Sequence, residues 1–233
     1  MKTLGVIGGV GPLSTAYFME VLINMTDAQT DQQHINMIVL NHTEIPDRTA
    51  YILGKSQESP VPIMVEDAKK LQSYGAEVIV TPCNTAHYFY NQLSKSVQVP
   101  FINMIYETAL QLKQDGISTA GIMATNGTIA ANLFQDSLKS QGIKAITPSA
   151  ISQQKVMDII YQQVKASKPV NQNDFDFVVD ELKSAGCQKI ILGCTELSIL
   201  KRDYNLSSFY IDALEVLCKK SILMCGGKLK ETY

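Results

Sequence analysis

Two cysteines stand at positions where a short apolar run gives way to polar residues. Cys83 lies in the segment TPCNT (81–85), and Cys194 lies in LGCTE (192–196). We expect each thiol to sit between the end of a strand and the start of a helix. There the unpaired backbone N–H groups and the positive end of the helix dipole should lower the pKa of the thiol from about 8.5 toward neutrality. That range suits a general base.

Matched positions for two thiols suggest a particular chemistry. Racemisation removes a proton from one face of a carbon and returns a proton to the other, so it needs an acid and a base on opposite sides. We expect Cys83 and Cys194 to serve as this pair and to exchange roles after each turnover. The alternative, that both are small buried hydrophobic residues, leaves their matched placement unexplained. That structural description suits Cys187, Cys218 and Cys225, which have no polar motif around them.

The elements that must position these cysteines follow from the pattern of apolar residues. Short runs rich in Val and Ile predict strands at residues 3–7, 36–40, 77–81, 101–104, 119–123, 144–147 and 189–192. Stretches with helical periodicity lie between most of them, at residues 12–26, 65–74, 106–114, 129–140, 156–165 and 175–185. Strands that alternate with helices and are apolar on both faces predict an α/β fold with parallel sheets covered by helices.

The sequence also contains an internal repeat. GVIGGVGP (5–12) is echoed 116 residues later by GIMATNGT (121–128), and TPCNT (81–85) is echoed 111 residues later by LGCTE (192–196). Chance similarity of strand–turn–helix units is the alternative, but two pairs of motifs at nearly one separation indicate two pseudo-symmetric domains. We expect the first domain to comprise residues 1–100 plus 210–233, and the second to comprise residues 101–209.

This arrangement predicts where the active site lies. Ligands in such folds bind outside the carboxyl ends of the parallel strands. Both cysteines follow strands, so we expect the loops of the two domains to meet in one interdomain cleft.

Composition excludes several classes of partner. The chain has 233 residues, 45% of them hydrophobic, and its formal net charge is −2 with 18% charged residues. It carries no basic block of the kind that nucleic acids or anionic membranes attract. The first apolar run breaks into glycines after about six residues, too short for a secretion signal. We therefore expect a cytoplasmic protein with free thiols that acts on a small molecule.

Three segments carry a resemblance to a known family. GGVGP (8–12), TPCNTAH (81–87) and LGCTEL (192–197) resemble the signature segments of the aspartate/glutamate racemase family, in matching order and spacing across essentially the whole chain. The resemblance implies interconversion of L- and D-aspartate or glutamate by two cysteines, without pyridoxal phosphate or any other cofactor or metal, in a homodimer. Alternatives on the same fold are a broad-specificity racemase of other amino acids such as homoserine, or an activity like that of maleate isomerase or hydantoin racemase.

Residues beside the cysteines are candidates for substrate binding. Asn84, Thr85, Thr125 and Thr195 offer side-chain hydrogen bonds that, with nearby backbone N–H groups, could hold the α-carboxylate as its charge grows in the transition state. Gly9, in the glycine-rich loop, belongs to the same expected set. Asn84 and Thr85 could instead be simple helix caps.

Charged candidates complete the expected site. Glu196 could bind the substrate ammonium group, hold residues that themselves contact the substrate, or be an ordinary acid at a helix start. The resemblance implies that Arg48 contacts a distal carboxylate and that Lys165 reaches in from the second domain. The glycine that usually follows that lysine is absent, so a solvated lysine at a helix end is the alternative.

The three histidines have several possible roles. His87, four residues after Cys83, could tune the thiol or pack against the sheet, while His42 could line the entrance and His34 should lie at the surface.

Two alternative functions fit the sequence less well. A nucleotide-binding role for the glycine-rich loop conflicts with its spacing and with Asn41, which stands where an acidic residue should bind the ribose. A two-lobed binding protein without activity would leave the two cysteines without a purpose.

Overall fold

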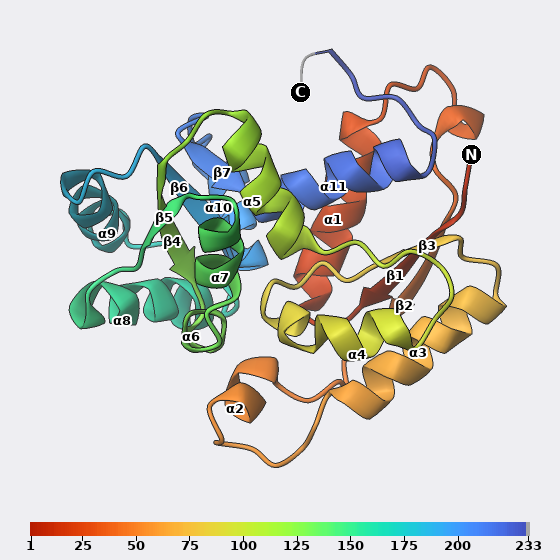
Figure 1. The fold of residues 1–233 in the computed structure, drawn as a ribbon, viewed down its shortest axis with the longest axis horizontal. Coiled ribbons are helices and arrows are strands. Elements are labelled where there is room, and N and C mark those ends of the chain that lie inside the picture. The colour runs from red at the N-terminus through yellow and green to blue at the C-terminus, as the bar shows by residue number, and fades with distance from the viewer. Residues whose placement is uncertain (232–233) are drawn as a thin grey trace. The chain divides into compact units, whose positions relative to one another are not determined.

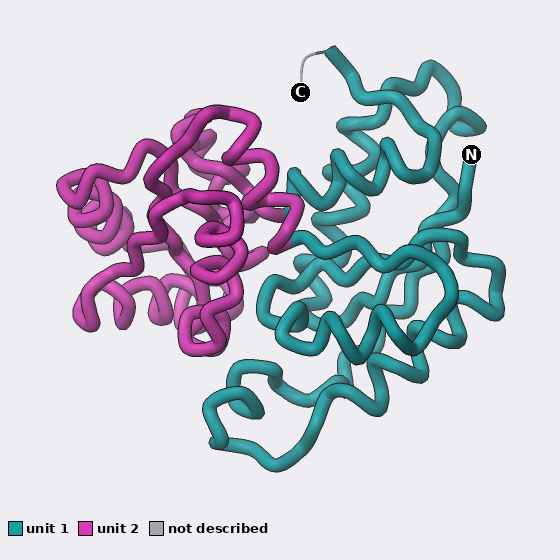
Figure 2. Tube along the Cα trace, in the orientation of Figure 1, with its two compact units in different colours: residues 1–104, 214–233 teal, residues 105–213 magenta. Residues whose placement is uncertain are grey.

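The computed structural model describes residues 1–231, which form two compact units (Figure 2). The first unit comprises residues 1–104 together with the C-terminal segment from Leu214, and the second comprises residues 105–213. Residues 232–233, which we expected in the first domain, lie outside the described residues.

The first unit is built on a parallel sheet with the strand order β2-β1-β3 (Figure 1). Its described strands are β1 (Leu4–Gly8), β2 (Met37–Asn41) and β3 (Val78–Val80). The helical elements are α1 (Pro12–Met25), η1 (Asp31–Gln33), α2 (Arg48–Ile52), α3 (Val61–Ser73), η2 (Thr85–Phe89), α4 (Tyr90–Lys95) and α11 (Ala213–Met224). Every residue of the central strand β1 is buried, as expected for a strand covered on both faces.

Helices pack on the two faces of this sheet. On one face, Ile7 and Ile79 share a hydrophobic cluster with Leu71 of α3 and Leu93 of α4. On the other, α1 and α11 lie side by side (Figure 1), and the Cys218 thiol is 3.7 Å from the carbonyl oxygen of Phe18. This packing fixes the strand ends from which the Cys83 loop departs.

The second unit contains a parallel sheet with the strand order β5-β4-β6-β7. Its described strands are β4 (Thr119–Ala124), β5 (Lys144–Ile146), β6 (Lys189–Gly193) and β7 (Tyr210–Asp212). The helical elements are α5 (Met104–Gln114), α6 (Asn126–Ala130), α7 (Leu133–Ser140), α8 (Ala150–Asp158), the π-helix η3 (Ile159–Val164), α9 (Gln172–Ser184) and α10 (Thr195–Asp203). The predicted α/β class with two helix-covered parallel sheets is confirmed.

The internal repeat extends to packing contacts in the two sheets. A Cβ added at Gly5 of β1 would lie 2.8 to 3.4 Å from side-chain atoms of Leu71, Ala76 and Ile79. A Cβ added at Gly121 of β4 would meet, at 3.1 to 3.3 Å, the three residues that follow those by 111 positions: Leu182, Cys187 and Ile190. Because glycine has no side chain, α3 can approach β1 closely in the first unit, and α9 can approach β4 closely in the second.

Two segments near the unit boundaries differ from expectation. The predicted strand at 101–104 is a single parallel bridge between Phe101 and Ile79, so it joins the first sheet and not the second. The backbone of Ile79 accounts for this, because its N–H donates to Pro100 and its carbonyl accepts from Ile102. The strand β7, which we placed in the first domain, pairs with β6 in the second sheet, and the chain returns only with α11.

Two predicted helices are each divided. The helix expected at 129–140 is α6 followed by α7, separated at Asn132, whose φ of 53° is left-handed. The helix expected at 156–165 is the end of α8 continued by the π-helix η3. Such π-turns occur frequently at functional sites, and η3 leads directly to Lys165.

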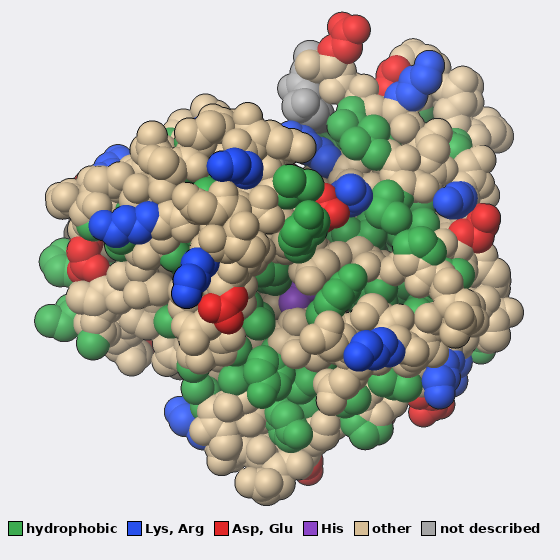
Figure 3. All heavy atoms as spheres, viewed as in Figure 1, with side chains coloured by type: hydrophobic (Ala, Val, Ile, Leu, Met, Phe, Trp, Pro, Cys, Tyr) green, Lys and Arg blue, Asp and Glu red, His purple; other side chains and the backbone are tan. Residues whose placement is uncertain are grey.

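The surface agrees with the balanced composition. On the face shown in Figure 3, lysine, arginine, aspartate and glutamate side chains are scattered, and both signs are interspersed. Within residues 1–231, no helix is long and apolar enough to cross a bilayer.

Candidate active site

Cys83 follows β3 in a loop held by one hydrogen bond to β1 and one within the loop. The Thr81 hydroxyl donates to the Ile7 carbonyl at 3.1 Å, and the Cys83 N–H donates to the Thr81 carbonyl at 2.9 Å. The Cys83 side chain is buried, with 8% exposed. The segment that follows begins as the 3₁₀-helix η2 and becomes the α-helix α4 at Tyr90, so Cys83 lies between a strand and a helical segment whose first turns are 3₁₀.

His87 holds this loop through contacts with two backbone groups. Its Nδ1 lies 2.9 Å from the Cys83 carbonyl oxygen, and its Nε2 accepts the Met104 N–H at 3.1 Å. These two bonds fit a neutral ring that carries its proton on Nδ1. Burial lowers the pKa of His87 to about 4, which keeps the ring neutral. Of the two roles considered, the contacts support packing and backbone anchoring.

Asn84 presents a buried amide group. It is 2% exposed, and neither Oδ1 nor Nδ2 has a hydrogen-bond partner among residues 1–231. It does not cap η2, which removes the simple capping explanation. A buried amide without partners carries a desolvation cost that a ligand would relieve. Thr85, the next residue, is also buried, at 5% exposure.

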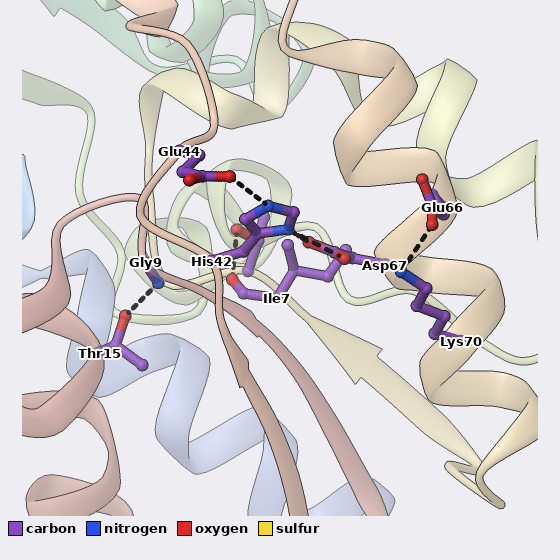
Figure 4. A network of polar contacts seen from close by, with 9 residues as sticks. Ile7, Gly9, Thr15, His42, Glu44, Glu66, Asp67 and Lys70 are labelled. Atoms are coloured by element: carbon purple, nitrogen blue, oxygen red, sulfur yellow. Dashed lines mark hydrogen bonds and ion pairs between the residues drawn. The ribbon is translucent and has the colours of Figure 1, made fainter.

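The glycine-rich loop after β1 packs against the end of β2. Gly9 has a φ of +80°, and a Cβ there would lie 2.3 Å from the carbonyl carbon of His42. Its N–H donates to the Thr15 hydroxyl at 3.0 Å (Figure 4). The Gly9 amide is therefore engaged within the loop, and the glycine serves close backbone approach.

A buried carboxylate that the sequence did not single out lies beside this loop. Asp67 of α3 is 2% exposed, and its Oδ2 lies 3.0 Å from Nδ1 of His42 (Figure 4). Nε2 of the same ring faces Glu44 at 3.9 Å. Asp67 sits in an amphipathic helix among other charged residues, so no local pattern distinguishes it from a solvated acid.

Arg48 begins α2 and is bonded to its own loop. Its Nη1 donates to the carbonyl oxygens of Ile45 at 3.2 Å and Pro46 at 3.1 Å. Asp47 caps the helix by accepting the Ala50 N–H. Arg48 is half-buried, and within the described part of the chain its buried Nε has no hydrogen-bond partner. The guanidinium is thus held in a fixed orientation with donor capacity left.

Cys194 is the N-cap residue of α10 and is joined to a carboxylate. Its thiol donates to Glu196 Oε2 at 2.7 Å, and the two side chains are buried. A Cβ at Gly193, the residue before it, would lie 2.7 Å from the Phe134 ring, so the strand end is tightly enclosed. The hydroxyl of Thr195 lies 3.5 Å from the same Glu196 oxygen.

The expected lowering of the Cys194 pKa is wrong. Burial raises the pKa of this thiol well above its ordinary value, and the charge of the Glu196 carboxylate raises it further. The Lys165 ammonium and the Glu196 backbone N–H lower this pKa, but by less. The helix N-terminus therefore acts as we expected, and the carboxylate and the buried environment outweigh it.

Lys165 reaches the second cysteine through Glu196. Its Nζ lies 3.0 Å from Glu196 Oε1 and 5.2 Å from the centre of the Tyr161 ring. The π-turn at η3 places Lys165 in this position, and the absent glycine does not prevent the contact. Lysine, carboxylate and thiol thus form one chain of contacts within the second unit.

Thr125 lies beside Cys194 along the sheet edge. Ala124 and Gly193 are register partners in β4 and β6, and Thr125 and Cys194 follow them. The Thr125 hydroxyl accepts the Thr128 N–H at 3.3 Å as the N-cap of α6. This hydroxyl already has a structural use.

Comparisons with known proteins identify the family and the fold. The sequence profile described as Asp/Glu/hydantoin racemase matches residues 7–220. The structure of aspartate racemase from Picrophilus torridus is similar with a TM-score of 0.89 and 32% identity, covering 100% of this chain and 98% of that one.

Two relatives of lower identity are also similar to this chain. The structure of an aspartate racemase homologue from Pyrococcus horikoshii has a TM-score of 0.79 at 24% identity, covering 97% of this chain and 100% of that one. The broad-specificity amino-acid racemase RacX of Bacillus subtilis is 24% identical over 94% of this chain and 96% of its own length.

Proposed function

The chain belongs to the Asp/Glu/hydantoin racemase family, and we propose that it interconverts the L- and D-forms of aspartate or glutamate, with Cys83 and Cys194 as the acid/base pair. The observation that carries this proposal is the matched placement of the two buried thiols. Each follows the strand that pairs with the first strand of its unit, β3 beside β1 and β6 beside β4.

The reaction needs two groups that address opposite faces of Cα. One thiolate removes the α-proton, and the opposing thiol delivers a proton to the other face, so the configuration inverts and the protonation states of the two cysteines are exchanged. We propose that the substrate binds so that the two thiols reach opposite faces of its Cα. Homodimer formation and independence from pyridoxal phosphate are parts of the same proposal.

Hydrogen-bond donors near the thiols would stabilise the intermediate. Loss of the α-proton moves negative charge onto the α-carboxylate, where pre-oriented donors have their largest effect. The Asn84 amide suits this task because it is buried and none of the described residues forms a hydrogen bond with it. Backbone N–H groups at the start of α10 are candidates on the other side.

Selectivity for acidic amino acids is assigned to Arg48. Its guanidinium is held by two backbone carbonyls and can still donate to a distal carboxylate. The Picrophilus torridus relative, 32% identical, is an aspartate racemase, which supports an acidic substrate. The broad-specificity relative supports the competing possibility of neutral substrates, which a substrate panel resolves.

A chiral assay tests the proposal. The purified full-length protein, dialysed against chelator and free of pyridoxal phosphate, is incubated separately with each enantiomer of aspartate, glutamate, homoserine and alanine, and the products are separated by chiral chromatography. The proposal predicts racemisation of aspartate or glutamate with kcat/KM at least about 10²-fold above that of the neutral amino acids. A preference for neutral side chains would establish a broad-specificity racemase, and absence of racemisation with every substrate would overturn the proposal.

A further inference from the structure

The two halves of the proposed catalytic pair differ at one matched position. The residue two places after Cys194 is Glu196, and the residue two places after Cys83 is Thr85. Glu196 accepts the Cys194 thiol at 2.7 Å. Among the described residues, no hydrogen bond or ion pair joins a carboxylate to the Cys83 thiol. The internal repeat is therefore broken where it would affect proton transfer.

We propose that Glu196 is a positioning residue for the Cys194 thiol and not a ligand of the substrate. This inference deepens the proposed function and rests on it. The Glu196 carboxylate holds the thiol hydrogen and keeps Cys194 protonated before substrate binds. Cys194 is then the proton donor of the resting protein.

The contacts of Glu196 leave little of it for a substrate. Its side chain is 7% exposed, Oε2 accepts the thiol, and Oε1 pairs with the Lys165 ammonium at 3.0 Å. A substrate ammonium group would have to compete with Lys165 and the Cys194 thiol for this buried carboxylate. Both carboxylate oxygens are thus used inside the unit.

Lys165 has the opposite effect on the thiol. When Cys194 gives its proton to Cα, the sulfur becomes a thiolate next to the Glu196 carboxylate, and two negative charges in a buried place repel each other. The Lys165 ammonium on the far side of the carboxylate offsets this repulsion. The charged groups that act on the Cys194 thiol are therefore Glu196, which favours the protonated form, and Lys165, which favours the thiolate.

Alkylation of the thiol measures this effect without any substrate. The full-length protein is treated with iodoacetamide across a range of pH, and the peptide containing Cys194 is quantified by mass spectrometry, with the unfolded protein as reference. Because the thiolate is the nucleophile, the midpoint of the alkylation rate reports the Cys194 protonation state. The variants are Glu196→Gln and Lys165→Met, with Glu181→Gln as a matched control. Glu181 accepts the hydroxyls of Ser149 and Ser152 in the same unit.

The inference predicts shifts of opposite sign. Glu196→Gln should move the alkylation midpoint of Cys194 to lower pH, Lys165→Met should move it to higher pH, and Glu181→Gln should leave it in place. An unchanged midpoint in Glu196→Gln, or shifts of the same sign in the first two variants, would overturn the inference. If Glu196→Gln does not fold, as judged by circular dichroism, an unchanged or lowered midpoint in Lys165→Met overturns it alone.

Steady-state kinetics separate positioning from substrate binding. In Glu196→Gln, the pH profile of kcat/KM should move while KM changes by less than about threefold. A large rise in KM with an unmoved pH profile would identify Glu196 as a substrate ligand and contradict the inference. If no amino acid is racemised but the alkylation midpoints shift as predicted, the proposed function fails and the role of Glu196 toward Cys194 stands.

Discussion

Nδ1 of His87 lies 2.9 Å from the carbonyl oxygen of Cys83, and Nε2 of the same ring accepts the N–H of Met104. One neutral imidazole thus ties the Cys83 loop to the segment that leaves the first unit. The ring is buried, so its protonated, charged form would lose its hydration. Burial therefore lowers the pKa of His87 to about 4.

This ring makes stability depend on pH in a defined window. The unfolded chain binds a proton at His87 below its ordinary pKa of 6.5, whereas the folded protein does so only below about 4. The stabilisation is present above pH 6.5 and is lost as pH falls toward 4, by about 3 kcal/mol. In His87→Gln, whose amide can still donate and accept, urea unfolding at several pH values should show this loss abolished. Equal pH dependence in the two proteins would contradict the assignment of a neutral buried ring.

Asn84 should trade stability for activity. Replacing its unpartnered amide by the similarly sized side chain in Asn84→Leu removes a buried polar group, so the free energy of unfolding should stay the same or rise by about 1 kcal/mol. The same change should lower kcat/KM by about 10²-fold, because a donor to the developing charge is lost. Denaturant titration and the chiral assay measure the two effects. A large loss of stability would show that the amide has a structural role.

Gly9 should tolerate no side chain. Both Gly9 and Gly75 have positive φ, but a Cβ at Gly75 meets nothing within 4 Å whereas one at Gly9 overlaps the His42 backbone. Gly75→Ala should therefore cost about 1–2 kcal/mol from backbone strain alone. Gly9→Ala should cost about 1–3 kcal/mol more from the overlap. Equal losses in thermal or urea unfolding would mean that the loop moves freely away from β2.

Arg48 should determine selectivity. If its guanidinium binds a distal carboxylate, Arg48→Ala should lower kcat/KM for aspartate by roughly 10²-fold while leaving slow turnover of alanine or homoserine nearly unchanged. Arg48→Lys is the matched variant, since it keeps the charge and loses the planar fork. Equal losses for acidic and neutral substrates would instead place Arg48 on the α-carboxylate, or show that its bonds to Ile45 and Pro46 maintain the loop.

The sequence predicted the sheets better than the side-chain contacts. Buried parallel strands are apolar on both faces, so β1, β4 and β6 begin and end within about two residues of the predicted runs. Strand partners are less visible in a sequence. The three residues of β7 could join either sheet, and only the register with β6 decides between them.

In the candidate site, too, the sequence predicted where residues lie along the chain better than which side chains they contact. The placement of Cys83 and Cys194 after strands could be predicted because it depends on local pattern alone. The bond between Cys194 and Glu196 depends on rotamers, and the position of Lys165 depends on a π-turn that its sequence does not distinguish from α-helix. The pairing of Asp67 with His42 joins residues that are distant in sequence, so no motif marks it.

The most direct test of the two-cysteine account is the racemisation of aspartate and glutamate by Cys83→Ala and Cys194→Ala in deuterated water. Chiral chromatography with mass detection follows inversion and deuterium incorporation together. Inversion needs both faces of Cα, so each variant should lose racemisation by at least about 10²- to 10⁴-fold, the range that a positioned acid or base contributes. Exchange on the one face that still has its thiol can survive. Racemisation by either variant at a rate close to that of the unaltered protein would contradict the account.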